Sequence, residues 1–271
     1  MGEPKVIFNS QKQWWGEKSE GTIECIKMAK SSKLKIMLKP HVWLRGGYFV
    51  GHFELDTEEK WKQWEQEYEQ YILHYTKIAD SLNVEMFCIG TELDKTAILR
   101  PIFWKQLILK IKKQYKGKLT YASNWDSYPE IPFWQELDYI GVDAYFPLSE
   151  SKTPSVEEIK KGWENHLELL EKFSNDINRP ILFTEYGYRS IDFAAKFPWE
   201  SHKSNEINLE AQKNAYQGLF EACWHQKWFA GGFLWKWYDR NYQLDLHYSD
   251  YTPQNKPAMK VIIEWYNNKN Q

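Results

Sequence analysis

Two glutamates stand at the end of apolar stretches that share one pattern. In the segment PILFTEYGYRS, residues 181–184 are typical of a buried strand, and Glu185 follows them directly. The segment VEMFCIGTE likewise runs through apolar residues to a threonine and then to Glu92. In α/β barrels, the residues that follow the strands form the rim that carries the catalytic groups. The shared pattern therefore predicts a pair of carboxylates that face one cavity.

Paired carboxylates serve glycosidic bond hydrolysis, metal binding or structural ion pairing. Hydrolysis needs one acid to protonate the leaving oxygen, and a second carboxylate that attacks the anomeric carbon or activates water. Retaining enzymes hold the two carboxyls about 5–5.5 Å apart and inverting enzymes about 6.5–9.5 Å, a separation that sequence does not measure. Metal binding is disfavoured because no HExxH motif or other close cluster of ligands accompanies either glutamate. The matching contexts favour hydrolysis over a structural pair.

The sequence neighbours of the two glutamates indicate different roles. Tyr188 and Arg189 follow Glu185 and would keep that carboxylate charged. A wholly apolar run precedes Glu92, and burial there would favour its protonated form. Because a nucleophile must be ionised and a general acid protonated, this predicts Glu185 as the nucleophile and Glu92 as the acid/base.

Bulk composition excludes several classes of protein. The 271 residues include 35 basic and 37 acidic side chains, so the net charge of −2 gives no case for nucleic acid or an anionic membrane as partner. No run of about 18 apolar residues exists that would span a membrane. Aromatic residues make up 17% of the chain, with 15 Trp. A Trp-rich cleft suits sugars, which combine apolar C–H faces with hydroxyl rims.

The cysteines and the N-terminal segment indicate little about ligands or location. Cys25, Cys88 and Cys223 lie far apart and form neither a metal-ligand spacing nor a disulfide framework. The proposed hydrolysis needs no cofactor. The opening segment MGEPKVIFNS lacks the apolar region of a signal peptide. We expect the natural start to lie upstream, so the sequence leaves the cellular location undetermined.

Strands and helices alternate from residue 34 onward. Strands are predicted at 34–38, 84–92, 119–123, 138–145, 180–185 and 231–237, and helices at 22–30, 57–81, 103–115, 156–173, 208–224 and 258–266. Such alternation indicates parallel pairing. Each strand ends in polar or aromatic residues, which favours an eight-stranded barrel over a doubly wound sheet with a single crevice. The predicted fold is therefore an α/β (β/α)8 TIM barrel, as a single catalytic domain over residues 1–271.

Two groups of aromatic residues receive different interpretations. In the helix predicted at 57–81, Trp61, Trp64, Tyr68, Tyr71 and Tyr75 recur every three or four residues. That stripe is typical of a helix face packed against a sheet. Trp14 and Trp15 stand side by side in a polar segment, where they either bind substrate or anchor a loop.

Six segments resemble glycoside hydrolase family 113: FCIGTELDK, LTYASNWD, YIGVDAYFPLS, ILFTEYGYRS, GGFLWKW and DYTPQNKPA. The resemblance runs from about Asn9 to Tyr266. Members of this family are β-mannanases of the retaining clan A, with the acid/base after strand four of the barrel and the nucleophile after strand seven. The resemblance therefore implies Glu92 as acid/base and Glu185 as nucleophile, in agreement with their sequence neighbours.

The resemblance also implies residues that bind the substrate: Lys39, His41, Asn124, Trp125, Asp143, Tyr145 and Trp235. Trp235 would stack under the sugar that is cleaved, and Tyr145 would hydrogen-bond the nucleophile. For His41, a structural role is an equal alternative. Aligned in this way, the strand at 34–38 is the third of the barrel, so we expect this chain to lack the N-terminal one or two strands.

The leading hypothesis is a retaining endo-β-1,4-mannanase that acts on β-mannan, glucomannan or manno-oligosaccharides by double displacement. A β-glucanase of the same clan is the near alternative, because specificity depends on recognition of the axial 2-hydroxyl. A non-catalytic carbohydrate-binding relic of a truncated barrel is the alternative from another class. The chain is expected to be a monomer that needs no metal or other cofactor.

Overall fold

The computed structural model describes residues 4–201, 206–238 and 248–267. The chain divides into two compact units. The first comprises residues 1–123 and 127–140, and the second comprises residues 124–126 and 141–271. The single domain predicted for residues 1–271 stays a prediction.

The first unit contains β1 (Met37–Leu38), β2 (Met86–Thr91) and β3 (Lys118–Asn124) in sequential order. The last residue of β3, Asn124, belongs to the second unit. Both pairings, β1 with β2 and β2 with β3, are parallel. Its helices are α1 (Ser19–Ser31), α2 (Glu58–Ser81), α3 (Asp94–Leu99) and α4 (Pro101–Gln114), with short 3₁₀ helices at Trp15–Glu17, Val50–His52, Tyr128–Glu130 and Trp134–Glu136.

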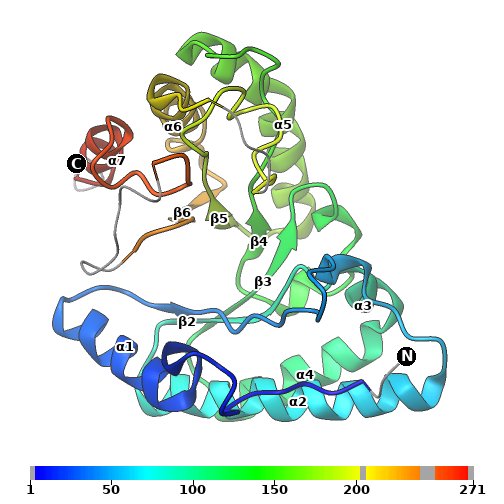
Figure 1. The fold of residues 1–271 in the computed structure, drawn as a ribbon. Coiled ribbons are helices and arrows are strands. Elements are labelled where there is room, and N and C mark those ends of the chain that lie inside the picture. The colour runs from blue at the N-terminus through cyan, green and yellow to red at the C-terminus, as the bar shows by residue number, and fades with distance from the viewer. Residues whose placement is uncertain (1–3, 202–205, 239–247, 268–271) are drawn as a thin grey trace. The chain divides into compact units, whose positions relative to one another are not determined.

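Helix α2 begins and packs as its sequence predicts. The Oγ1 atom of Thr57 accepts a hydrogen bond from the backbone N of Lys60 and so caps the first turn. The aromatic stripe is buried, and its tyrosines also find polar partners, as when the hydroxyl of Tyr68 donates to the carbonyl of Ile89 in β2. Helix α4 lies beside α2 (Figure 1). The stripe is thus core packing, as predicted.

The second unit contains β4 (Ile140–Asp143), which begins at the unit boundary, then β5 (Ile181–Tyr186) and β6 (Phe229–Leu234). The order is sequential, and β5 pairs with β6 in parallel. Its helices are α5 (Val156–Ile177), α6 (Leu209–Cys223) and α7 (Ala258–Asn267). Helix α6 packs against both α5 and α7 (Figure 1). All residues of β4 and β5 are buried, as expected for strands covered on both faces.

Local sequence signals account for the ends of the helices in this unit. Ser155 and Glu158 form a capping box at the start of α5, in which each side chain bonds the backbone N–H of the other. Asn178 ends α5 in the left-handed conformation, with φ at 56°. The side chain of Asn208 accepts a hydrogen bond from the backbone N of Ala211 and caps α6.

The predicted alternation of strands and helices is confirmed, with differences at the element ends. The strand predicted at 34–38 is shortened to the two residues of β1, and Pro40 follows it, a residue that cannot donate to a ladder. Helix α3 was not predicted, because six residues are too few to display a clear periodicity. No helix among the described residues is both long enough and apolar enough to cross a membrane.

Candidate active site

Glu185 lies in β5 with its side chain largely withdrawn from solvent, since the residue is 9% exposed. The hydroxyl of Tyr145 donates a hydrogen bond of 2.7 Å to its Oε2 atom. The backbone of Glu185 is held as well, because its carbonyl accepts from the backbone N of Ala144 at 2.7 Å. A register shift against β6 occurs between Phe183 and Tyr186, and such irregularities commonly redirect a side chain.

Tyr145 is positioned to act as a hydrogen-bond donor. Burial raises the pKa of its phenol well above the ordinary value, and the nearby charge of Glu185 raises the pKa further. The phenol therefore stays protonated at neutral pH, where it donates to the carboxylate. The hydrogen bond predicted between Tyr145 and Glu185 is thus present in the structure.

Asp143 is fully buried at the end of β4, with an exposed fraction of 0%. Its Oδ1 atom accepts a hydrogen bond of 2.7 Å from Oγ1 of Thr184, the residue before Glu185. The bond to Thr184 ties β4 to β5. The substrate-binding role that the family resemblance implied for Asp143 stays a prediction.

Trp235 follows β6 directly and is anchored beside β5. Its backbone N donates to the carbonyl of Tyr186 at 2.8 Å, and its peptide bond with Lys236 is cis. Gly187 makes this approach possible, because a Cβ atom there would lie 2.2 Å from the carbonyl oxygen of Trp235. The indole of Trp235 is half-buried, so the second unit brings Tyr145, Glu185 and Trp235 to the ends of three consecutive strands.

Glu92 belongs to the first unit and follows β2 in an uncommon backbone conformation. Its φ of 51° lies in the left-handed region, which side chains other than glycine rarely adopt and which typically costs about 1–3 kcal/mol. Its backbone N donates to the carbonyl of Ala122 at 2.7 Å, and the register between β2 and β3 shifts between Cys88 and Thr91. Such local strain is frequent at functional sites. The prediction that Glu92 and Glu185 face one cavity stays a prediction.

The other residues predicted to bind substrate lie partly in the first unit and partly in the second. In the first, Lys39 and His41 are half-buried after β1, and the imidazole of His41 stacks on Trp43 with 4.2 Å between ring centroids. In the second, the indole of Trp125 stacks on Trp199 at 5.3 Å, and Asn124 precedes it. Trp14 and Trp15 are both exposed, so they do not anchor their loop by burial.

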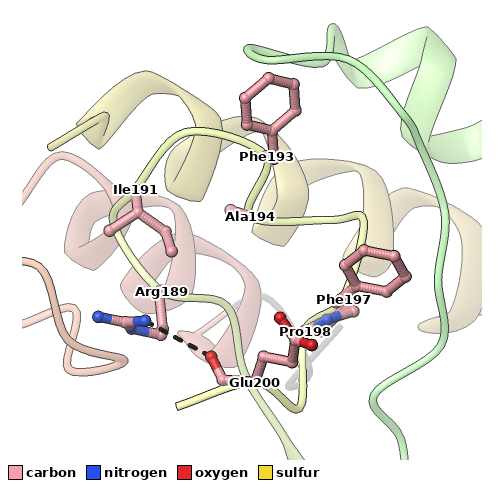
Figure 2. Close-up of a pocket in the computed structure, with 7 residues that line it drawn as sticks. All are labelled: Arg189, Ile191, Phe193, Ala194, Phe197, Pro198 and Glu200. Carbon is pink, nitrogen blue, oxygen red and sulfur yellow. Dashed lines mark hydrogen bonds between the residues drawn. The ribbon is translucent and has the colours of Figure 1, made fainter. Parts of the chain in front are cut away.

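Arg189, which was expected to keep Glu185 charged, hydrogen-bonds two backbone carbonyls, and its influence on Glu185 stays a prediction. Its Nε atom donates to the carbonyl of Ser249 at 3.1 Å, and its Nη1 atom to the carbonyl of Glu200. Arg189 and Glu200 line a small pocket of about 30 Å³, with the five other lining residues being Ile191, Phe193, Ala194, Phe197 and Pro198 (Figure 2). None of the predicted substrate-binding residues lines this pocket, which has room for about one water molecule.

Comparison with known proteins decides the family. The sequence profile described as Glycoside Hydrolase Family 113 matches residues 6–256. The chain belongs to glycoside hydrolase family 113. It is accordingly a glycoside hydrolase, as predicted. A search of curated proteins found no match.

Solved structures of the family share the fold of this hydrolase. One, described as a complex of a family 113 β-1,4-mannanase, is 30% identical and superposes with a TM-score of 0.84, over 98% of this chain and 83% of that chain. A β-mannanase from Alicyclobacillus acidocaldarius, in complex with ManMIm, is 26% identical with a TM-score of 0.81, over 93% and 78% of the two chains. A β-glucuronidase from an uncultured Clostridium, at 19% identity and a TM-score of 0.66, shares the fold alone.

The family 113 chain therefore has the α/β fold of the (β/α)8 barrel, with six strands among the described residues. No cluster of three or more His, Cys, Asp or Glu that would hold a metal occurs in that part of the chain. Sequence reasoning missed Thr184 as the partner of Asp143, and Trp199 as the partner of Trp125. The segment FPW at 197–199 is the only signal for Trp199, and it carries no strand or helix pattern.

Proposed function

We propose that this family 113 hydrolase is a retaining endo-β-1,4-mannanase, with Glu185 as the nucleophile and Glu92 as the acid/base. The observation that carries the proposal is the hydrogen bond from Tyr145 to Oε2 of Glu185. A phenol that stays protonated donates to an ionised carboxylate, which is the form that a nucleophile needs. The family 113 structures named as β-1,4-mannanases supply the substrate class.

The two carboxyl groups would act in two steps. In the first, Glu185 attacks the anomeric carbon while the glycosidic C–O bond breaks, and Glu92 gives its proton to the departing sugar oxygen. In the second, Glu92 takes a proton from water, the water oxygen bonds to the anomeric carbon, and the ester to Glu185 breaks. Two inversions leave the anomeric configuration unchanged, and one water molecule is consumed for each bond that is cleaved.

Trp235 and Tyr145 would shape the position of the sugar that is cleaved. The indole of Trp235 is half-buried beside β5, where one ring face can contact the apolar face of a pyranose. Lys39, His41, Asn124 and Trp125 would bind the substrate through hydrogen bonds and ring contacts. Asp143 would act indirectly, through Thr184, because its carboxylate is buried.

Product release from mannohexaose, glucomannan and cellohexaose tests the proposal, with Glu92→Gln and Glu185→Gln beside the wild type. We expect turnover of the two mannose-containing substrates, and a loss of at least about 10³-fold in kcat in both variants. Glu171→Gln, an exposed position on α5, is the matched control and should behave as the wild type. Faster cleavage of cellohexaose would favour a β-glucanase, whereas sugar binding without turnover would favour a non-catalytic relic.

The stereochemistry of the first product provides an independent test. Proton NMR of the fresh reaction should show the β-anomer before mutarotation, because double displacement retains configuration. Initial appearance of the α-anomer would contradict the nucleophilic role of Glu185. Turnover that survives Glu185→Gln would contradict it as well.

A further inference from the structure

The loop that follows β5 carries large aromatic side chains that its fold leaves in solvent. Phe193, Phe197 and Trp199 are 41%, 39% and 40% exposed. Phe197 and Trp199 lie edge to face, with 5.6 Å between ring centroids. Trp199 in turn stacks on Trp125 at 5.3 Å, with the two indole planes 25° apart. One face of Trp199 therefore lies against Trp125, while part of its ring remains open to solvent; the two stacked rings are here called the indole pair.

Contacts within the second unit connect the indole pair to Glu185. Phe146, the residue after Tyr145, packs edge to face on Trp125 at 5.8 Å. From the other side, the ring of Tyr145 lies 6.2 Å from that of Tyr251, whose hydroxyl donates to the carbonyl of Pro198. Trp125 and the segment that carries Trp199 are therefore each connected to Glu185 through a chain of contacts. On both of these paths, other side chains lie between the indole pair and the carboxylate.

Electrostatics agrees with this placement. Burial raises the pKa of the Tyr251 phenol; the charge of Arg189 opposes this rise, and the charges of Asp250, Glu185 and Glu200 add to it. Glu185 therefore lies close enough to affect a residue that holds the backbone of the segment carrying Trp199. The ring partners of the indole pair are Phe146 and Phe197, and the Nζ atom of Lys196 lies 5.2 Å from the centre of the Phe197 ring. Aromatic faces of this kind suit a ligand that combines an apolar face with polar groups.

The shape of the region points to an open ring face as the binding surface. The pocket beside Phe197 has a volume of about 30 Å³, whereas small-molecule pockets typically measure about 300–1,000 Å³. A pyranose therefore does not fit into this pocket. Phe193 and Phe197 point in different directions (Figure 2), and only Phe197 joins the ring contacts of Trp199.

We propose that Trp199, stacked on Trp125, binds a pyranose of the β-linked substrate away from the bond that is cleaved, and so makes the enzyme prefer longer chains. The inference rests on the proposed function, because it assumes that Glu185 acts on the same polysaccharide. The apolar C–H face of a sugar would lie on an indole face, and its hydroxyls would remain at the solvent side. Such a contact contributes to substrate affinity and leaves the chemical step unchanged.

Kinetics on mannohexaose and mannotriose test the proposal, because a sugar bound away from the cleaved bond should matter more for the longer substrate. In Trp199→Ala we expect KM for mannohexaose to rise about tenfold, the factor that corresponds to about 1.4 kcal/mol, with kcat within about twofold of wild type. Both constants for mannotriose should stay within about twofold. Trp199→Phe should restore most of the affinity, because a flat ring remains.

Phe193→Ala is the matched control, because it removes an equally exposed ring from the same loop outside the stack. It should leave both substrates unaffected. An equal loss on both substrates in Trp199→Ala, no loss on mannohexaose, or the same loss in Phe193→Ala would overturn the proposal.

Calorimetric binding of mannohexaose to Glu185→Gln separates the two proposals. This variant binds without cleaving, so adding Trp199→Ala should weaken binding about tenfold whether or not the wild type turns over. If the wild type fails to cleave mannan but Trp199→Ala weakens the binding of mannohexaose, the proposed function is contradicted and the sugar site is supported. If the wild type cleaves mannan and Trp199→Ala leaves the binding of mannohexaose unchanged, the sugar site is contradicted and the proposed function is supported.

Discussion

The phenol of Tyr145, just after β4, donates a 2.7 Å hydrogen bond to Oε2 of Glu185 in β5. The donor is buried and stays protonated, because burial and the charge of Glu185 both raise its pKa. The bond therefore holds the Oε2 atom of Glu185 in place. It also links the end of β4 to β5, the strand that carries the proposed nucleophile.

Replacing Tyr145 with Phe should lower kcat on mannohexaose by about 10- to 100-fold. A hydrogen bond to a charged group typically contributes about 1.5–3 kcal/mol, and the carboxylate would lose that support and its orientation. Because the ring is retained, the thermal unfolding midpoint should change little. Unchanged kcat in a folded variant would contradict a role for this bond in catalysis.

The bond between Thr184 and Asp143 should contribute measurably to stability. Thr184→Val keeps the side-chain shape and removes the donor, which should lower the free energy of unfolding by about 1–3 kcal/mol. Chemical denaturation of Thr184→Val, Asp143→Asn and the double variant forms a complete cycle. We expect a coupling energy of about 0.5–3 kcal/mol, and purely additive effects would exclude the interaction.

Gly187→Ala should disturb the junction of β5 and β6. The new Cβ would lie 2.2 Å from the carbonyl oxygen of Trp235, so one of the two backbones must shift. We expect a loss of at least about 1–3 kcal/mol of unfolding free energy, together with a lower kcat because Trp235 moves. Gly16→Ala is the matched control, since no atom lies within 4 Å of the position that its new methyl group would occupy. That variant should be neutral or slightly stabilised.

Lys256 should give the unfolding free energy a distinct pH dependence. Its Nζ atom donates to Oγ of Ser190 at 2.8 Å and to the carbonyl of Asp250 at 2.9 Å. Burial lowers its pKa from 10.5 to about 8, with the charge of Asp250 opposing the shift and that of Arg189 adding to it. Above about pH 8 the folded chain therefore binds fewer protons at this site than the unfolded chain, and the contribution of Lys256 to stability rises with pH.

Denaturation curves of wild type and Lys256→Met between about pH 7 and pH 9.5 measure this contribution. The free energy of unfolding of the wild type should increase relative to that of the variant across this window. Lys260→Met, at an exposed position of α7, should show a constant difference. A wild-type advantage that shrinks as pH rises would contradict the assigned direction of the pKa shift.

The capping box of α5 provides a prediction independent of the active site. Ser155→Ala removes the acceptor for the backbone N of Glu158 and should lower the unfolding free energy by about 1 kcal/mol. Kinetic constants should remain those of the wild type, because α5 carries none of the proposed site residues. A large loss of activity in a folded variant would show that α5 influences the site.

Local patterns in the chain suffice to identify the elements and the residues that end them. Apolar runs, helical periodicity and caps such as Thr57 and Ser155 involve only neighbouring residues, so the alternation of strands and helices and the buried stripe of α2 follow from them. The threonine–glutamate strand ends singled out Glu92 and Glu185 for the same reason. Short elements such as α3 were not predicted, because six residues are too few to show helical periodicity.

Which side chains meet depends instead on the way the chain folds back on itself. Strand register joins Tyr145 to Glu185 and Thr184 to Asp143, whereas Arg189, the sequence neighbour of Glu185, donates to backbone carbonyls of Ser249 and Glu200. The same holds for Trp199, whose stack on Trp125 leaves no pattern in the loop sequence. Hydrogen bonds and ring contacts between distant residues are set by strand pairing and by the paths of loops, and neither is encoded in a local pattern.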